Sequence, residues 1–230
     1  MLRSLFMTHR AGGCAILAAL LPVILVACDG STPNALPPRA TQGTTQDTTQ
    51  GTTPSPTPAA TAEIFAVFVQ PSGIIRVRLA TNEAPRVSMA FIAVAQRGYF
   101  TGRTWSDFSP VVRQTGESAP IFTVQRELSP KLLFDVGGRL CASNTSEEHT
   151  ARSKPNRIFL TVKPQDRWNL LYSVFGVIVE GLDIATRLPA EEPILEVRIE
   201  GDTAALRARF AKELVEWNAA MDAAKISSVR

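Results

Sequence analysis

The sequence predicts a mainly β domain, a closed barrel of short antiparallel strands with few helices. Short runs rich in Val, Ile and Phe recur along residues 63–202, separated by Gly, Pro, Asn or Ser. In the run 73–81, apolar and basic residues alternate, which is typical of a strand with one buried and one solvated face. Many short strands favour closure into a barrel, because closure removes exposed sheet edges.

The domain is expected to begin with a hairpin followed by a helix. Residues 64–69 and 73–81 flank a turn at 70–73 that contains Pro, Ser and Gly. Beyond the hairpin, Pro85 suits the first turn of a helix and Gly98 suits the residue after its end. Apolar residues between these two positions recur at helical spacing.

The rest of the domain is expected to be mostly strands. They are predicted at residues 104–108, 111–116, 138–143, 156–162, 172–179 and 193–200, with a short helix at Leu182–Leu188. The polar segment 145–158 is expected to be an exposed loop.

A further amphipathic helix is expected within residues 203–230. Its apolar stripe consists of Leu206, Phe210, Leu214, Trp217 and Met221. We expect this stripe to pack back on the domain; the alternative is a face for dimerisation or for docking a client protein.

Residues 1–27 have the features of a secretory signal, since Arg3 and Arg10 precede an uncharged apolar stretch. The tetrapeptide Leu-Val-Ala-Cys that ends at Cys28 resembles a lipobox, which predicts cleavage before Cys28 and lipid attachment to it. The alternative is an uncleaved membrane anchor. Asp29 resembles a retention signal for the inner membrane, so we expect an extracytoplasmic protein on the outer face of the cytoplasmic membrane, with the outer membrane as the alternative.

Residues 28–62 are expected to form a stalk. They are dominated by Thr, Pro, Gln and Gly, and this composition cannot bury enough apolar surface to offset the entropy of ordering. Proline-rich sequence favours extended conformations, while Gly and Thr keep the chain flexible.

Charge and cysteine content exclude several classes of function. Of the 24 Lys and Arg residues, two lie in the signal, so the mature chain has 22 Lys and Arg against 21 Asp and Glu. This balance lacks the excess of positive charge that is typical of nucleic-acid-binding proteins. Cys141 is the single cysteine after Cys28, which excludes an internal disulfide in the domain, and we expect a buried thiol. His149 has no Cys or His partner nearby in the sequence, so no metal site is expected.

Four stretches resemble the cyclophilin-type peptidyl-prolyl cis-trans isomerases in their order along the chain: residues 73–105, 127–144, 157–164 and 174–188. The last, VFGVIVEGLDIATRL, carries the most specific match. The resemblance implies an eight-stranded antiparallel barrel capped by two helices, with a proline-binding groove on one outer face. It also implies rotation about Xaa-Pro bonds, a reaction that breaks no bond and needs no cofactor or metal.

The resemblance also assigns groove residues. Gln114 stands at the family's glutamine, Phe159 at the floor of the proline pocket, and Asn144 at the asparagine that binds the peptide backbone. Val112, Trp168 and Tyr172 complete the expected groove, with Tyr172 in place of a histidine. Asp107 stands where the family has its arginine donor, and a carboxylate cannot donate a hydrogen bond to the prolyl nitrogen.

Arg157 stands where the family has a second glutamine. Side chains two apart on a strand share a face, so Arg157 and Phe159 are expected to point into one groove. Two interpretations follow. Arg157 is a relocated donor, or it pairs with Asp107 and leaves a groove that binds without catalysis.

These observations predict an isomerase of weak activity at residues 63–202 that acts on Xaa-Pro segments of exported polypeptides and is tethered to the membrane through Cys28. The alternative is a catalytically silent module that binds proline-containing peptides or proteins. A solute-binding lipoprotein is disfavoured, because one barrel-sized domain leaves no second lobe to close over a ligand.

Overall fold

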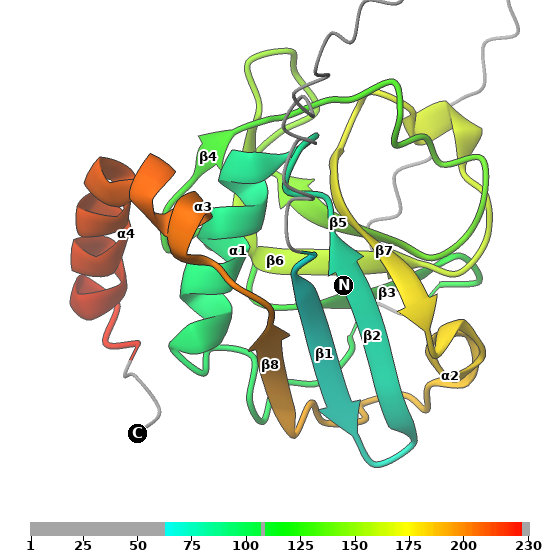
Figure 1. The fold of residues 1–230 in the computed structure, drawn as a ribbon. Coiled ribbons are helices and arrows are strands. Elements are labelled where there is room, and N and C mark those ends of the chain that lie inside the picture. The colour runs from blue at the N-terminus through cyan, green and yellow to red at the C-terminus, as the bar shows by residue number, and fades with distance from the viewer. Residues whose placement is uncertain (1–62, 107–108, 227–230) are drawn as a thin grey trace, which may run out of the picture. The chain divides into compact units, whose positions relative to one another are not determined.

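The structure is a computed structural model that describes residues 63–106 and 109–226, and these residues form the expected β-rich domain (Figure 1). Its strands are β1 (Phe65–Gln70), β2 (Gly73–Leu79), β3 (Val112–Thr115), β4 (Val124–Gln125), β5 (Arg139–Asn144), β6 (Arg152–Thr161), β7 (Ser173–Glu180) and β8 (Glu196–Glu200). Its helices are α1 (Pro85–Gln96), the 3₁₀ helix η1 (Asp166–Trp168), α2 (Leu182–Arg187), α3 (Ala204–Arg209) and α4 (Ala211–Ala223). The signal segment, Cys28, the stalk and Asp107 lie outside the described residues.

The hairpin of β1 and β2 follows from the sequence pattern. Phe65 pairs with Arg78, and Gln70 pairs with Gly73 across the turn. Val77 is buried, whereas Arg78 on the same strand points to the solvent and pairs with Glu63. The alternation of apolar and basic residues therefore places one face of the hairpin in the core.

All the described strands join one curled antiparallel sheet in the order β3–β6–β5–β7–β2–β1–β8, with β4 paired to β6 outside this path. The two edge strands, β3 and β8, do not pair with each other. The sheet is therefore open, and the prediction of a closed barrel is wrong.

The segment expected to be a strand at 104–108 accounts for the open edge. Its described residues, 104–106, lie between β3 and the residues before β8 but make only isolated bridges, from Thr104 to Pro193 and from Ser106 to Gln114. At the first bridge, Ile194 donates to the Arg103 carbonyl at 2.8 Å and Trp105 donates to the Glu192 carbonyl at 3.4 Å. Through these residues the two edges of the sheet are connected at single residue pairs and not by a continuous ladder of hydrogen bonds.

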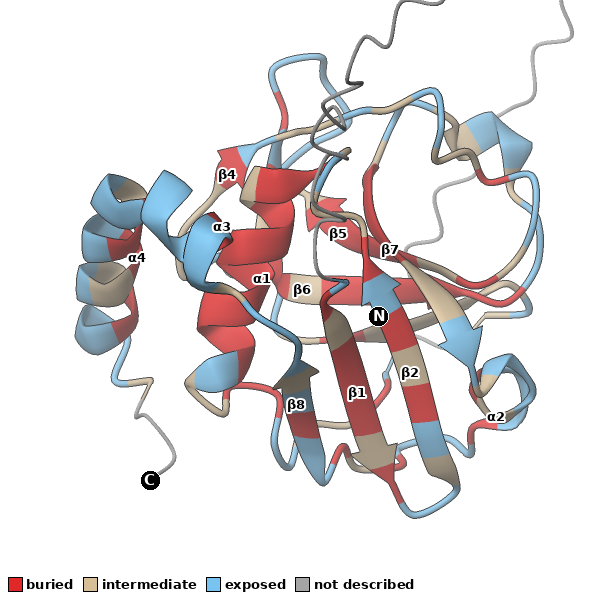
Figure 2. Ribbon diagram, in the orientation of Figure 1, coloured by how far each residue is buried: buried red, intermediate tan, exposed pale blue. Residues whose placement is uncertain are grey.

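Helix α1 fills the concave side of the sheet, and Figure 2 shows it buried along most of its length. Phe91 packs against Phe68, Phe100 and Phe175 with ring centres 5.2 to 6.2 Å apart. The helix begins at Pro85, as predicted, and the carboxylate of Glu127 accepts hydrogen bonds from the next two backbone N–H groups. An acidic residue that is distant in the sequence thus caps the N-terminal, positive end of the helix.

The C-terminal segment forms two helices, where the sequence pattern predicted one. The chain turns at Phe210, between α3 and α4. The predicted apolar stripe is buried, and Figure 2 shows the buried side of α4 turned toward α1. Trp217 stacks on Phe122 with ring centres 5.4 Å apart, and Arg86 of α1 forms an ion pair of 2.7 Å with Glu213. This segment packs back on the domain.

Strand β6 is longer than expected. It begins at Arg152, so the loop spans 145–151 instead of 145–158; residues 145–150 are exposed and Ala151 is buried. The guanidinium of Arg152 donates to the hydroxyl and the carbonyl of Thr123, which fixes the start of the strand despite its polar sequence.

None of the helices in the described residues has the length and apolar character that crossing a bilayer requires.

The packing of α4 can be tested by Trp217→Ala. Removing a buried Trp side chain is expected to lower the free energy of unfolding by about 3 to 5 kcal/mol, which urea denaturation would measure. Val215→Ala on the same helix is the matched control, because Val215 is 71 % exposed and Trp217 is 6 % exposed. Equal effects of the two substitutions would contradict the packing.

Burial raises the pKa of the Cys141 thiol well above its usual range. Above roughly pH 8.5 the unfolded thiol ionises while the folded thiol stays protonated, so stability should fall as the pH rises. The expected loss is about 1.4 kcal/mol per pH unit relative to Cys141→Ala, measured by urea denaturation from pH 7 to 10. If both proteins followed the same pH dependence, the thiol would not be shielded from solvent.

Candidate functional site

A cavity of about 340 Å³, called here the main cavity, lies on the outer face of the sheet. Strands β3, β5 and β6 and the segment around η1 contribute its walls. The predicted groove residues that the structure describes all line it: Val112, Gln114, Asn144, Arg157, Phe159, Trp168 and Tyr172. The remaining one, Asp107, lies outside the described residues.

Three aromatic rings form an apolar box in the main cavity. Phe159 is 4 % exposed, and its ring centre lies 5.9 Å from Trp168 and 5.3 Å from Tyr172, both nearly perpendicular to it. Beneath Phe159, the buried side chains of Phe134, Cys141 and Val174 form a small cluster separate from the main core. Edge-to-face packing fixes these rings. The box therefore offers an apolar slot for a small ring.

Register explains why Phe159 faces outward. On β6, Phe159 lies opposite Gln114 of β3 and Cys141 of β5, and residues directly opposite share one face of a sheet. The neighbouring residues Ile158 and Leu160 point to the other face and belong to the main core.

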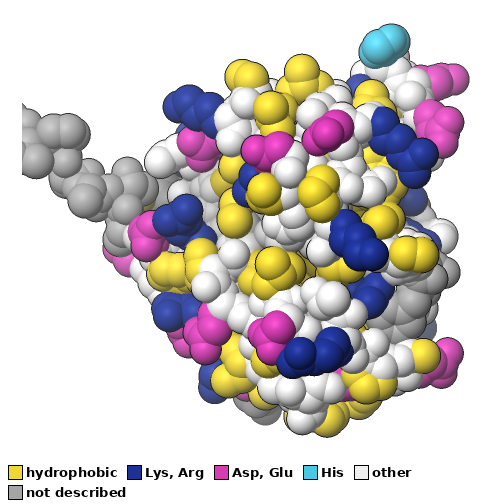
Figure 3. All heavy atoms as spheres, turned by 90° about the vertical axis from the view of Figure 1, so that its right-hand side faces the viewer, with side chains coloured by type: hydrophobic (Ala, Val, Ile, Leu, Met, Phe, Trp, Pro, Cys, Tyr) yellow, Lys and Arg dark blue, Asp and Glu magenta, His cyan; other side chains and the backbone are white. Residues whose placement is uncertain are grey.

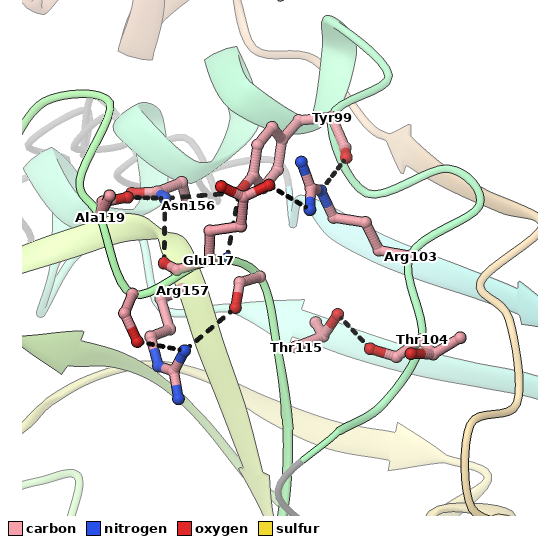
Figure 4. Close-up of polar contacts among 10 residues, drawn as sticks. Tyr99, Arg103, Thr104, Thr115, Glu117, Ala119, Asn156 and Arg157 are labelled. Atoms are coloured by element: carbon pink, nitrogen blue, oxygen red, sulfur yellow. Dashed lines mark hydrogen bonds and ion pairs between the residues drawn. The ribbon is translucent and has the colours of Figure 1, made fainter.

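Polar side chains on β3, β5 and β6 form a connected wall beside the box. The Gln114 side-chain amide donates to the Ser143 hydroxyl at 2.6 Å, and its oxygen accepts from Arg157 at 3.1 Å. The Arg157 guanidinium also donates to the Gly116 carbonyl and, at 2.8 Å, to the Ser118 hydroxyl (Figure 4). Both the glutamine and the guanidinium are thereby held in place.

A bulge in β6 positions Arg157. Ala142 of β5 pairs with Ile158, but the next residue, Ser143, pairs with Lys154, so three residues of β6 bulge out. Within the bulge, Asn156 is fully buried and donates to the carbonyls of Glu117 and Ala119 (Figure 4).

Gly116 is required where the chain meets this bulge. Its φ is +92°, and a Cβ there would lie 1.9 Å from the carbonyl oxygen of Asn156. A side chain at this position is excluded by backbone contact as well as by conformation. The loop after β3 therefore fits directly against the bulge that carries Arg157.

The side-chain oxygen of Asn144 is an acceptor without a hydrogen bond in the described structure. Its amide nitrogen donates to the Leu171 carbonyl at 2.9 Å, whereas its side-chain oxygen is buried and has no hydrogen-bond partner among the described residues. Such an acceptor suits a ligand N–H. Arg113, by contrast, turns away from the main cavity and donates to the Thr186 carbonyl.

Several lining residues were missed by the sequence analysis, namely Ser143, Ser146, Glu147 and Lys154. Burial, and then the charge of Arg157, lower the pKa of Lys154, while burial and then Glu147 raise the pKa of Tyr172. At neutral pH the phenol is therefore protonated. Simple alternation along β6 does not indicate Lys154, because the bulge between Lys154 and Ile158 changes which side chains face the main cavity.

Other surface features do not converge on the main cavity. His149 is exposed on the loop 145–151, and within the described ranges no group of His, Cys, Asp or Glu side chains could hold a metal ion. A separate cavity of about 350 Å³ lies near the end of β2, lined partly by Glu63, Arg78 and Lys131. Figure 3 shows basic, acidic and apolar side chains interspersed on the face seen from the right of Figure 1.

Comparison with known proteins agrees with this geometry. The profile of the cyclophilin type peptidyl-prolyl cis-trans isomerase family matches residues 65–202. Peptidyl-prolyl cis-trans isomerase B of Bacillus subtilis (strain 168) is 25 % identical over 134 residues, which cover 55 % of this chain and 91 % of that protein.

Solved cyclophilins share the fold. A cyclophilin type peptidyl-prolyl cis-trans isomerase from Cryptosporidium parvum superposes with a TM-score of 0.52 at 18 % identity, covering 61 % of this chain and 98 % of the other. A cyclophilin from Hirschia baltica gives 0.50 at 13 % identity, covering 66 % and 87 %. Because the family profile spans more than half of the sequence and the fold agrees, the chain belongs to the cyclophilin-type peptidyl-prolyl cis-trans isomerase family.

Proposed function

We propose that the domain catalyses cis-trans isomerisation of Xaa-Pro bonds in exported polypeptides. The observation that carries this proposal is the main cavity, where the aromatic box of Phe159, Trp168 and Tyr172 adjoins the polar wall of Gln114 and Arg157. Family membership supports the same reaction.

Isomerisation of an Xaa-Pro bond requires no nucleophile and no cofactor. Rotation about an amide bond has a barrier of about 18 to 20 kcal/mol, and no bond is broken. The box would hold the proline ring, and the spare oxygen of Asn144 would accept a backbone N–H of the peptide. A fixed donor near the prolyl nitrogen would weaken amide resonance as the bond twists, and it would act mainly in the transition state.

Arg157 is our choice for this donor. The family's donor position is occupied by Asp107, a hydrogen-bond acceptor, so activity is expected to be weak. Arg157 lines the same cavity as Phe159, and its guanidinium is held by acceptors on Gln114 and Ser118. A donor that is already oriented needs no reorganisation during the reaction.

The competing function is peptide binding without catalysis. It is favoured by the same hydrogen bonds, because donors of Arg157 that are engaged with the protein are not directed at a substrate. The two functions share the aromatic box and differ in the role of the guanidinium.

Exchange spectroscopy by NMR on an Ala-Pro model peptide separates the two. The wild-type domain should accelerate exchange, and Arg157→Ala should lower the catalysed rate by about 100-fold, as expected for loss of one preorganised donor. Arg157→Lys should retain part of the rate, since it keeps the charge but not the planar fork.

Arg198→Ala is the control for this experiment, because Arg198 is exposed on β8 and pairs only weakly with Glu196 at 3.9 Å. Peptide binding without faster exchange would favour the silent module. Full activity in Arg157→Ala would exclude Arg157 as the donor.

We further propose that lipid on Cys28 holds the domain at the outer face of the cytoplasmic membrane, near polypeptides that emerge unfolded from export. The lipobox-like sequence before Cys28 supports this. A coil of about thirty residues has a reach of some 30 Å. The stalk would thus keep the groove within reach of clients at the membrane.

Cys28→Ser tests the anchor. In cells fed a labelled fatty acid, the wild-type protein should carry the label and sediment with membranes. The variant should be unlabelled and accumulate uncleaved or in soluble fractions. If the signal segment of the wild-type protein is cleaved but the protein carries no label, lipid attachment is contradicted.

A further inference from the structure

A second cavity of about 420 Å³, called here the side cavity, adjoins the main cavity. Four residues line both: Asn144, Glu147, Trp168 and Tyr172. The rings of Trp168 and Tyr172, with centres 5.7 Å apart, therefore stand between the two spaces. A peptide with its proline in the main cavity would bring a neighbouring side chain to the side cavity.

Two arginines line the side cavity and not the main one. Arg126 donates to the backbone carbonyls of His149 and Leu171 at 2.7 and 2.9 Å, so its guanidinium is fixed between two loops. Arg167 is exposed on η1, with its guanidinium carbon 5.9 Å from the centre of the Trp168 ring. Within the described part of the chain, Arg167 forms no ion pair.

Apart from Glu147, the remaining described lining of the side cavity is apolar or neutral. Leu171 is 46 % exposed and presents an apolar surface beside the two rings. Among the described residues of the lining, the one acid is Glu147, which faces the main cavity as well, where Lys154 and Arg157 also lie. Cations thus outnumber acids in the described lining of both cavities.

We propose that the side cavity is a subsite for an acidic side chain, aspartate or glutamate, that neighbours the proline of a bound peptide. The proposal rests on the proposed function, because it requires a proline-containing peptide in the main cavity. The alkyl part of a glutamate would contact Leu171 and the rings, and its carboxylate would meet Arg126 and Arg167. The preferred clients are then acidic Xaa-Pro segments.

The test uses peptides that contain one Ala-Pro pair. Glu, Gln or Lys is placed in turn at the two positions that flank this pair, one before it and one after it. Binding to the full domain is measured by NMR titration. At one position Glu should bind roughly two- to fivefold more tightly than Gln, and Lys more weakly, as expected for exposed ion pairs. This preference should shrink at high salt.

Arg167→Glu should reverse the order at that position, so that the Lys peptide binds best. Arg209→Glu is the matched control, because Arg209 is also exposed and also lies beside the aromatic residue that follows it, 5.3 Å from the ring of Phe210, but on α3. Glu147→Gln should strengthen the preference for Glu.

The outcomes separate this subsite from the function on which it rests. Equal binding of the Glu, Gln and Lys peptides would overturn the acidic subsite and leave the proline-binding groove intact. A preference for Lys in the wild-type domain would assign the subsite to Glu147 instead and would also overturn the proposal. Failure of every peptide to bind would contradict the proposed function itself.

Discussion

The hydrogen bonds of Asn156 are the interaction on which the site depends. This side chain is buried in the bulge of β6 and holds the carbonyls of Glu117 and Ala119, while its oxygen accepts from the backbone of Ile121 at 3.4 Å. The loop after β3 is thus fastened to β6, and the same loop supplies acceptors for Arg157. A buried amide with its partners satisfied specifies one arrangement, because any other leaves polar groups unpaired in an apolar surrounding.

An open sheet needs another way to cover its interior, and here the interior is covered from one side by α1 and at the edge by Trp105. The Trp105 ring is fully buried against Phe68, and its indole N–H donates to the side chain of Gln70 at 2.6 Å. Helices α3 and α4 then cover the outer side of α1. The face of the sheet that forms the groove takes no part in this packing. Its aromatic cluster is separate from the core, so residues of the groove could diverge, as at Tyr172, without disturbing the fold.

Local patterns were enough to predict the hairpin, α1 and α2, because alternation and helical spacing are properties of short segments. The family resemblance predicted that Gln114, Asn144 and Phe159 share one groove, and all three line the main cavity. What could not be predicted depends on contacts between distant segments. The open edge follows from the partners of Thr104 and Ser106, and β4 has only two residues, too few for a pattern. The bulge of β6 follows from pairing with β5, which also decides that Lys154 reaches the cavity.

The place of β1 in the sheet has a mechanical consequence. This strand begins two residues after Glu63, yet it is an internal strand, paired with β2 on one side and β8 on the other. A force transmitted through the residues that precede Glu63 would therefore load two hydrogen-bonded ladders together. Because Phe65 pairs with Arg78 and with Glu200, such a pull would meet resistance at the first residue of the strand on both sides. If β1 were an edge strand, the same pull would load one ladder instead of two.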